Sequence, residues 1–204
     1  MKQAVFQFRQ WGGKRKGAGR KPAGERARDK HQKREILKRR FPVHVTVRMR
    51  DEVWRLRSGR CFRALRACFA GSSARPDFKT IHYSIQGNHI HFIIEAEDER
   101  ALTSGMRSLN ARIANALNAV MKRKGRVLAD RYHARILKTP TETAKTLRYV
   151  LRNYEHHLRR VLPAHWRDPF ATANAPFAAP NTWLLAMATK ASAMGSRVWG
   201  RSEF

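Results

Sequence analysis

The sequence has few acidic residues and no long hydrophobic run. Only 15 of its 204 residues are Asp or Glu, against 43 Lys or Arg, which gives a formal net charge of +28. No window approaches the roughly 18 consecutive apolar residues of a transmembrane helix, and the N-terminus lacks the residue order of a signal peptide. The charge predicts a polyanionic partner, with nucleic acid the first candidate and an anionic membrane surface the second. We take nucleic acid as the partner and expect no membrane partner.

Cysteine is also scarce. Cys61 and Cys68 are the only two, and they lie seven residues apart in a pattern typical of a helix. Two cysteines cannot form a tetrahedral metal site alone, and a disulfide framework is not expected from them. A reducing, cytoplasmic compartment is therefore the natural setting for this chain.

The first forty residues form a strongly basic segment. Thirteen Lys or Arg and three acidic residues lie between positions 12 and 40, with almost nothing apolar before Ile36 that would build a core. The stretch GAGRKPAG resembles an AT-hook, a slim motif that enters a narrow minor groove. We expect residues 1–40 to be a disordered DNA-binding arm, and a merely solubilising tail is the alternative. The expected DNA contacts in this arm are Arg15, Lys16, Arg20 and Lys21.

The rest of the chain is predicted to be one α+β domain at 41–160, followed by an appendage at 161–204. Alternating apolar and polar residues predict strands at 41–49, 78–87, 88–97 and 126–138. Apolar residues recurring every three or four positions predict helices at 52–70, 98–124 and 140–160, and a short one around 183–189. The order β-α-β-β-α-β-α is that of a ferredoxin-like, split β-α-β fold. Such a fold is an antiparallel sheet with helices on one face, here with an extra C-terminal helix.

Two histidines lie one residue apart inside the apolar run QGNHIHFIIEAED. Residues two apart on a strand point to the same face, so His89 and His91 lie side by side. Ile90, Phe92 and Ile94 then point the opposite way, beneath the helices. Two imidazoles at this spacing can reach one metal ion. The alternative is a pair of histidines whose hydrogen bonds are satisfied by backbone or by a neighbouring strand.

The last predicted helix carries a tyrosine and an asparagine four residues apart. Tyr149 and Asn153 therefore share one helical face. If this helix crosses the open side of the sheet, Asn153 can reach the metal and Tyr149 can reach a substrate phosphate. The alternative is that Tyr149 packs as an amphipathic core residue.

Two groups of cations outside the arm are candidate phosphate contacts. Arg131 and Arg135 alternate along the fourth predicted strand and so share a face. Lys122 and Arg123 belong to a Lys-Arg-Lys run at the end of the long helix. We expect all four to contact DNA, and a solvated basic edge is the alternative for the strand pair.

Four segments, in order, resemble the HUH-type single-tyrosine transposases of insertion sequences, in particular the REP-associated tyrosine transposases. They are RFPVHVTVRMR, IQGNHIHFIIEAED, DRYHARIL and LRYVLRNYEHH, and the family often carries a GAGRKP-like arm as well. The resemblance covers about residues 40–158 plus the arm. It implies that His89 and His91 form the H-U-H motif, that Tyr149 is the nucleophile and that Asn153 is the third metal ligand.

This resemblance also implies an activity. The expected reaction is cleavage and rejoining of single-stranded DNA beside a hairpin, through a 5′-phosphotyrosine and a divalent ion, Mg²⁺ or Mn²⁺. Family members act as monomers or homodimers, so both states are open for this chain. The expected location is the cytoplasm, in association with the nucleoid.

Two other interpretations use the same residues. In a non-catalytic nucleic-acid-binding module, His89, His91 and Tyr149 are structural, and binding is strongly salt-dependent without a covalent product. A metal hydrolase would use the histidine pair as a catalytic zinc site and needs an acidic group, for which Glu95 is the local candidate. Within the transposase hypothesis, Tyr154 is the rival nucleophile. It lies about 140° around the helix from Tyr149 and therefore away from Asn153.

Overall fold

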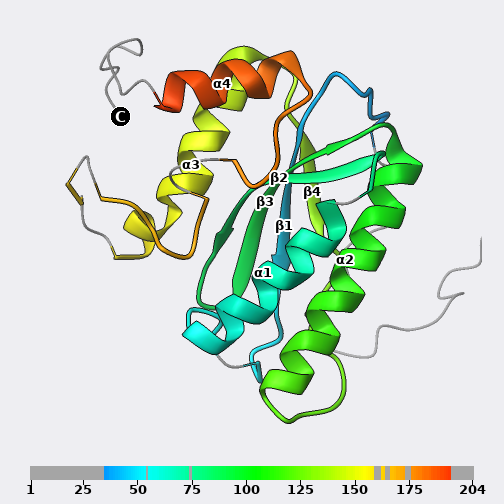
Figure 1. The fold of residues 1–204 in the computed structure, drawn as a ribbon, viewed down its shortest axis with the longest axis vertical. Helices are drawn as coiled ribbons and strands as arrows, with labels where there is room; N and C mark the ends of the chain where they lie inside the picture. The colour runs from blue at the N-terminus through cyan, green and yellow to red at the C-terminus, as the bar shows by residue number, and fades with distance from the viewer. Residues whose placement is uncertain are drawn as a thin grey trace, which may run out of the picture. The chain divides into compact units, whose positions relative to one another are not determined.

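A four-stranded antiparallel sheet lies at the centre of the fold (Figure 1). The structure, a computed structural model, describes residues 35–53, 55–73, 75–158, 162–163, 166–172 and 176–193. Residues 35–204 group into one unit. The arm contacts expected at Arg15, Lys16, Arg20 and Lys21 lie outside the described residues and stay a prediction.

The strands pair in the order β2-β3-β1-β4, which is the order of a ferredoxin-like fold and confirms the predicted fold class. Their bounds are β1 Val43–Arg48, β2 Phe78–Ile85, β3 His89–Ala96 and β4 His133–Ile136. Thr46 of the central strand β1 lies opposite His91 on one side and opposite His133 on the other. The strand predicted at 126–138 is much shorter than expected. Its early part makes only an isolated bridge between Leu128 and Met49.

Four helices are described around this sheet. They are α1 Gly59–Ser73, α2 Glu99–Val120, α3 Pro140–Leu158 and α4 Trp183–Ala193. The short helix expected in the appendage is confirmed as α4. None of the described helices is both long and apolar enough to cross a membrane.

The predicted start of the first helix, at residue 52, is wrong. Residues 51 and 52 form a turn instead, and α1 begins only at Gly59. Ser58 lies immediately before it, and its Oγ accepts a hydrogen bond from the backbone N–H of Cys61 at 3.3 Å. A serine that accepts a bond from the third residue after it is a typical helix N-cap, so the helix start is marked by Ser58 and not by the apolar periodicity upstream.

The second helix begins as predicted and ends early. Asp98 accepts a hydrogen bond from the backbone N–H of Ala101 at 2.7 Å and so caps α2. The helix ends at Val120, four residues before the predicted end at 124. The backbone has already left the helical region at Lys122, where φ is 50°. Gly125, whose φ is 98°, lies in the loop that follows rather than at the helix end.

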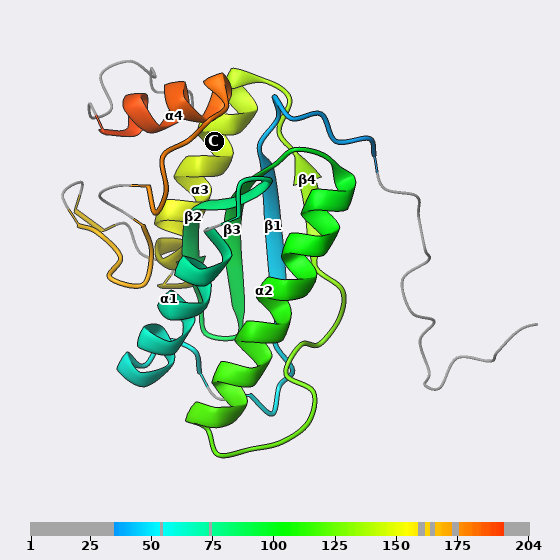
Figure 2. The same cartoon turned by 45° about the vertical axis from the view of Figure 1, so that its right-hand side comes forward.

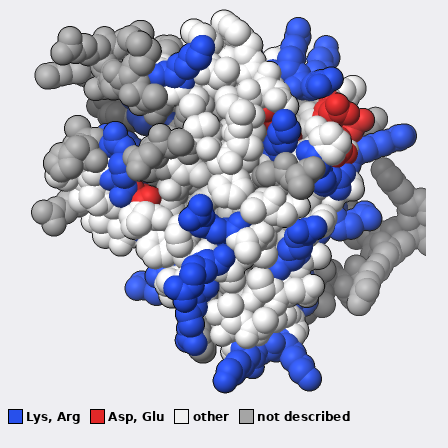
Figure 3. Space-filling model, in the orientation of Figure 1, with Lys and Arg blue, Asp and Glu red and all other residues white. Residues whose placement is uncertain are grey.

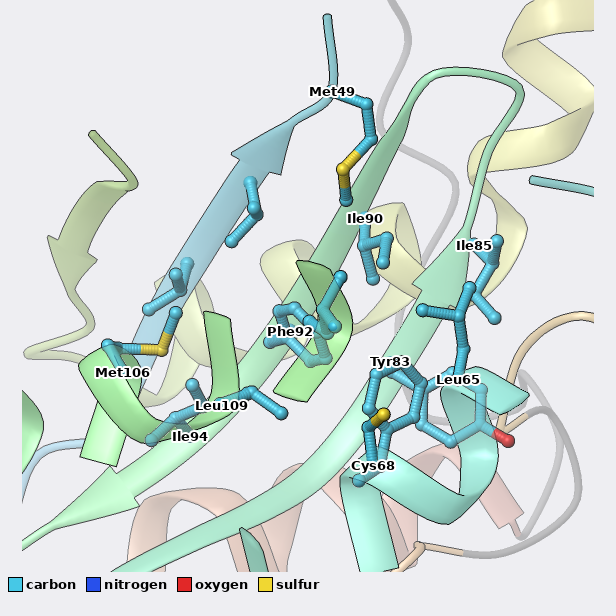
Figure 4. Close-up of a cluster of buried hydrophobic side chains, with 14 of the residues drawn as sticks. Met49, Leu65, Cys68, Tyr83, Ile85, Ile90, Phe92, Ile94, Met106 and Leu109 are labelled. Atoms are coloured by element: carbon cyan, nitrogen blue, oxygen red, sulfur yellow. The ribbon is translucent and has the colours of Figure 1, made fainter. Parts of the chain in front are cut away.

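Helices α1 and α2 pack side by side on one face of the sheet and enclose the main core (Figures 1 and 2). Val45 of β1 and Ile90 and Phe92 of β3 are fully buried here, and Figure 4 shows Ile90 and Phe92 within this cluster. Burial of each such side chain contributes about 1.5–3 kcal/mol. Helix α2 comes close to strand β2 at Gly105, where an added Cβ would lie 2.2 Å from the Phe78 ring.

The opposite face of the sheet is covered by α3, which packs against β2 and β3, and by α4, which packs against α3. Helices therefore lie on both faces, and the extra C-terminal helix forms the second helical layer. This layer encloses a smaller apolar core made of Ile81, Ile93, Leu137, Leu147, Val150, Leu185 and Ala188.

Polar contacts join the appendage to the domain. Asp168 binds the guanidinium of Arg57 through both carboxylate oxygens, each at 2.8 Å. His82 of β2 is buried between two hydroxyls, with Nδ1 3.0 Å from Thr172 Oγ1 and Nε2 3.3 Å from Thr189 Oγ1. The described parts of the appendage are thus attached to the sheet at several points.

Candidate active site

The histidine pair lies on the α3 face of the sheet, as the alternation along β3 predicts. His91 is buried and His89 is half-buried, and their ring centroids are 4.8 Å apart. Ile90, between them, is fully buried in the opposite core. The strand therefore separates two functions residue by residue, with apolar packing on one side and two imidazoles on the other.

Each histidine is oriented by a hydrogen bond to its Nδ1 atom. His89 Nδ1 lies 2.9 Å from Asn88 Oδ1. An amide oxygen only accepts, so His89 carries its proton on Nδ1 and presents a lone pair on Nε2. His91 Nδ1 lies 3.1 Å from both Thr46 Oγ1 and His44 Nε2. Partners on Nδ1 that leave Nε2 available are the arrangement that supports a metal-ligating histidine.

The local environment keeps these rings neutral. Burial, with smaller contributions from the neighbouring His44, His89 and His157, lowers the pKa of His91 to about 3. Burial likewise lowers the pKa of His89 to about 4, with smaller contributions from His157 and Arg48. At neutral pH both rings are therefore uncharged, which is the protonation state that binds metals.

Helix α3 brings Tyr149 next to the histidines. Its ring centroid lies 5.4 Å from that of His91 and 6.2 Å from that of His44. The tyrosine is 42% exposed, while Leu147 and Val150 supply the buried positions of this part of the helix. The alternative that Tyr149 is a core residue is therefore wrong, and its side chain is accessible to a substrate.

Asn153, one helical turn after Tyr149, is 1% exposed. Its Oδ1 is buried and has no hydrogen-bond partner in the described part of the chain, and the same holds for His91 Nε2. A buried polar atom without a partner costs roughly 1–3 kcal/mol. The lone pair of Asn153 Oδ1, and that of His91 Nε2 in the tautomer protonated on Nδ1, therefore require a ligand that accepts them.

A divalent cation fits this requirement. The available donors are two neutral imidazoles and one amide oxygen, a mixed set of nitrogen and oxygen ligands. Among the described residues no group of three or more His, Cys, Asp or Glu side chains can hold a metal, so the amide of Asn153 is needed for a third ligand. This donor set adds no negative charge and leaves the charge of a bound ion uncancelled.

Three further histidines surround the pair and were missed as site residues. His44 of β1 stacks on His91 with ring centroids 5.2 Å apart. On α3, His156 lies 5.9 Å from Tyr149 and His157 lies 5.4 Å from His89, centroid to centroid. His156 and His157 both lie in the last turn of α3 and are exposed. The spacing of seven residues between Tyr149 and His156, about two helical turns, was the signal available for placing them on one side.

The rival tyrosine lies elsewhere. The Tyr154 ring is covered by the guanidinium of Arg57, whose carbon is 3.6 Å from the ring centroid. Trp166 stacks on the ring at 6.1 Å with an interplanar angle of 22°. Tyr154 is thus part of the attachment of the appendage, while Tyr149 is the tyrosine beside the histidines.

The carboxylate of Glu95, the acid proposed for a metal hydrolase, is already engaged in hydrogen bonds. Glu95 is buried and accepts hydrogen bonds from the backbone N–H of Asn181 at 2.7 Å and of Thr182 at 2.8 Å. It also accepts one from Thr182 Oγ1 at 2.6 Å. The carboxylate therefore holds the residues that precede α4, and the hydrolase interpretation loses its local acid.

The basic residues expected to contact DNA outside the arm differ in their surroundings. Arg135 donates to Glu142 Oε1 from Nε at 2.9 Å, so its guanidinium already has a carboxylate partner. Arg131 and Lys122 are exposed. Arg123 is half-buried and donates to the backbone oxygen of Arg126 at 3.1 Å. Their contacts with DNA stay predictions.

Comparisons with known proteins give fold similarity only. No family model and no curated protein sequence matches the chain. A solved REP-associated tyrosine transposase bound to a REP hairpin aligns with a TM-score of 0.57 and 17% identity, over 71% of this chain and 82% of that one. A protein from Deinococcus radiodurans R1 described as a transposase aligns at TM-score 0.41 and 10% identity, over 61% of this chain and 95% of that one. The first alignment shows that this chain shares the transposase fold.

Proposed function

We propose that the protein is a DNA transposase that cleaves and rejoins single-stranded DNA beside a hairpin, with Tyr149 as nucleophile. The observation that carries the proposal is an accessible tyrosine next to two neutral histidines and a buried, unpartnered amide oxygen. The shared fold with a transposase whose structure contains a REP hairpin supports the choice of substrate. A module that only binds DNA would need neither the accessible tyrosine beside the histidines nor the unpartnered amide oxygen.

In the proposed reaction the hydroxyl oxygen of Tyr149 attacks the scissile phosphorus. An O–P bond to the tyrosine forms, the bond from phosphorus to the 3′ oxygen breaks, and the phenolic proton leaves to a base. The 3′ oxygen takes up a proton and becomes a free hydroxyl, and the 5′ phosphate stays on the enzyme. Because the phosphodiester energy is kept in the phosphotyrosine, the reverse attack by a 3′-OH rejoins DNA without ATP.

His89, His91 and Asn153 would hold a divalent ion, Mg²⁺ or Mn²⁺, through Nε2, Nε2 and Oδ1. When bound, this ion supplies Lewis-acid polarisation of the scissile phosphate. The two histidines contribute by staying neutral and by the fixed orientation that Asn88, Thr46 and His44 give them. Asn153 contributes its oxygen from the same helix as the nucleophile, which fixes the spacing between ligand and attacking atom.

The remaining parts of the chain complete this proposal. We assign residues 1–40 as a DNA-binding arm acting through Arg15, Lys16, Arg20 and Lys21, and residues 41–160 as the catalytic domain. The described residues of 161–204 attach to this domain rather than to its catalytic groups. The protein would act on the nucleoid in the cytoplasm, as a monomer or a homodimer.

The test is covalent capture of DNA. The purified protein is incubated with labelled single-stranded hairpin DNAs from its own genomic neighbourhood, with Mn²⁺ or Mg²⁺, and separated on a denaturing gel. We expect an adduct that resists denaturation, disappears with EDTA and disappears in Tyr149→Phe. Tyr154→Phe is the matched control and keeps the adduct. Binding without an adduct on any hairpin would replace this proposal with the non-catalytic binding module.

A further inference from the structure

Gln86, the residue that follows strand β2, is polar and yet fully buried. Its Nε2 donates a hydrogen bond to Ser84 Oγ at 2.8 Å. Its Oε1 is also buried and has no hydrogen-bond partner in the described part of the chain. An amide oxygen left in this state is unfavourable, since it has lost its hydration without a replacement. The side chain of Gln86 therefore lacks a partner for one of its two polar atoms.

The strand register places Gln86 beside the histidine pair. Ser84 lies opposite His91 in the pairing of β2 with β3, and the backbone N–H of Gln86 donates to the backbone oxygen of His89 at 2.8 Å. Residues opposite each other in an antiparallel pair point to the same face of the sheet. Gln86 therefore shares the α3 face with His89 and His91. Because its amide is bonded to Ser84, it extends along β2 towards the position opposite His91.

Six buried side-chain atoms have no hydrogen-bond partner within the described residues. Three belong to α2 and the turn after it, on the opposite face of the sheet: Asn110 Oδ1, Asn118 Oδ1 and Arg123 Nη1. The other three face α3 or belong to it: Gln86 Oε1, His91 Nε2 and Asn153 Oδ1. Helix α3 packs against β2 and β3, so these three share one layer. All three can offer lone pairs to a cation, whereas the α2 group includes a guanidinium nitrogen that can only donate a proton.

We propose that Gln86 Oε1 is a fourth protein ligand of the divalent cation held by His89, His91 and Asn153. This inference rests on the proposed function for the presence of that ion. The resemblance to HUH transposases implies only the other three ligands. Amide oxygen is a ligand type that suits Mg²⁺ and Mn²⁺, and binding to the ion removes the unfavourable burial of an unpartnered oxygen.

The charge of the chain gives a fourth ligand a purpose. The formal net charge is +28, and Figure 3 shows many Lys and Arg side chains on one face of the molecule and few acidic ones. This field opposes the binding of a further cation. Carboxylates usually offset such repulsion at Mg²⁺ and Mn²⁺ sites, but Glu95 on β3 is already bonded to Asn181 and Thr182. A second amide oxygen adds affinity and still leaves the charge of the ion uncancelled for the substrate phosphate.

The test measures the binding of Mn²⁺ to the full chain without DNA, from the electron paramagnetic resonance signal of the free ion. Gln86→Met keeps an unbranched side chain of similar size and removes the oxygen. The matched control is Asn118→Leu. Asn118 also donates one hydrogen bond from its amide, to the backbone oxygen of Gly125 at 2.9 Å, and its Oδ1 is also buried without a partner, but it lies on α2. Circular dichroism verifies that each variant folds.

We expect Gln86→Met to raise the dissociation constant for Mn²⁺ by about tenfold or more, since the loss of even an outer partner of a metal ligand has an effect of that order. Asn118→Leu should keep the wild-type value. Gln86→Glu, which places a charged oxygen at the same position, should bind Mn²⁺ at least as tightly as the wild type. Equal dissociation constants in the wild type and Gln86→Met would overturn the proposal. If Gln86→Met does not fold, weaker binding by Gln86→Glu would overturn it.

Covalent capture of DNA by the wild type separates this result from the proposed function. If the Tyr149 adduct forms but Gln86→Met binds Mn²⁺ as tightly as the wild type, the transposase chemistry holds with three ligands and the fourth ligand fails. If Gln86→Met weakens Mn²⁺ binding but no adduct forms, the four-ligand site holds and the transposase chemistry fails. If the wild type binds no Mn²⁺, the fourth ligand fails together with the whole metal site.

Discussion

On the α1–α2 face of the sheet, β1 and β3 present only apolar side chains, whereas on the α3 face the same strands present His44, Thr46, His89 and His91. Alternate residues of one strand thus serve different purposes. The first face buries its side chains fully. The second keeps partly buried imidazoles and an amide oxygen without a partner, at a cost in stability. A substitution on the first face should therefore change mainly the stability of the fold, and a substitution at the next residue, on the second face, mainly the proposed chemistry.

The largest expected effect is on the apolar face. Phe92→Ala removes a fully buried ring and should lower the free energy of unfolding by about 3–5 kcal/mol. Thr46→Val, on the other face, loses one hydrogen bond to His91 and should cost about 0.5–1.5 kcal/mol. Urea denaturation of both variants measures the difference. Equal losses in the free energy of unfolding would mean that the two faces do not differ as described. If Phe92→Ala does not fold, Phe92→Leu replaces it and should show a smaller loss.

The second effect concerns metal binding on the α3 face of the sheet, where His89, His91 and Asn153 lie; we call this the histidine face. Mn²⁺ at about 100 times its dissociation constant should raise the free energy of unfolding of the wild type by roughly 2.7 kcal/mol. Asn153→Leu should lose most of this response. Without metal it should be at least as stable as the wild type, because a buried oxygen without a partner is removed.

Asn110 offers a matched control for that experiment, since its Oδ1 is also buried and unpartnered but lies on α2. Asn110→Leu should keep the full Mn²⁺ response in thermal denaturation. A full response in Asn153→Leu would remove Asn153 from the metal site.

The smallest effect is the pH dependence of the histidine face. Burial lowers the pKa of His82 from 6.5 to about 4. As the pH falls, His82 is protonated in the unfolded chain before it is protonated in the folded one. Its contribution to the free energy of unfolding is therefore complete above about pH 6.5 and is lost as the pH falls towards 4. Between pH 7 and 5 we expect a loss of roughly 1–2 kcal/mol from this residue.

His82→Asn, which cannot be protonated, should lose correspondingly less stability over that interval in denaturation measured at both pH values. Tyr83→Phe, the next residue and on the opposite face, should keep the wild-type pH dependence. An unchanged dependence in His82→Asn would contradict the assignment of His82 as a buried neutral ring.

Local patterns predicted much of this arrangement. Alternation placed His89 and His91 on one face and Phe92 on the other, and a spacing of four put Tyr149 and Asn153 together. Contacts between distant segments were not predictable in this way. Glu95 is bound by residues 86 and 87 positions later in the chain, Asn181 and Thr182. No periodicity encodes such a pairing, which depends on how the appendage folds back.

The most direct test of the account is to identify the tyrosine that becomes attached to DNA. The chain has four tyrosines, and Lys and Arg residues between them place each in a different tryptic peptide. Tyr149 lies in YVLR and Tyr154 in NYEHHLR. The covalent adduct is digested with trypsin and nuclease and analysed by mass spectrometry. We predict a nucleotide joined through its 5′ phosphate to the hydroxyl oxygen of Tyr149 and of no other tyrosine. A modification on Tyr154, Tyr132 or Tyr83 would contradict the account of the active site.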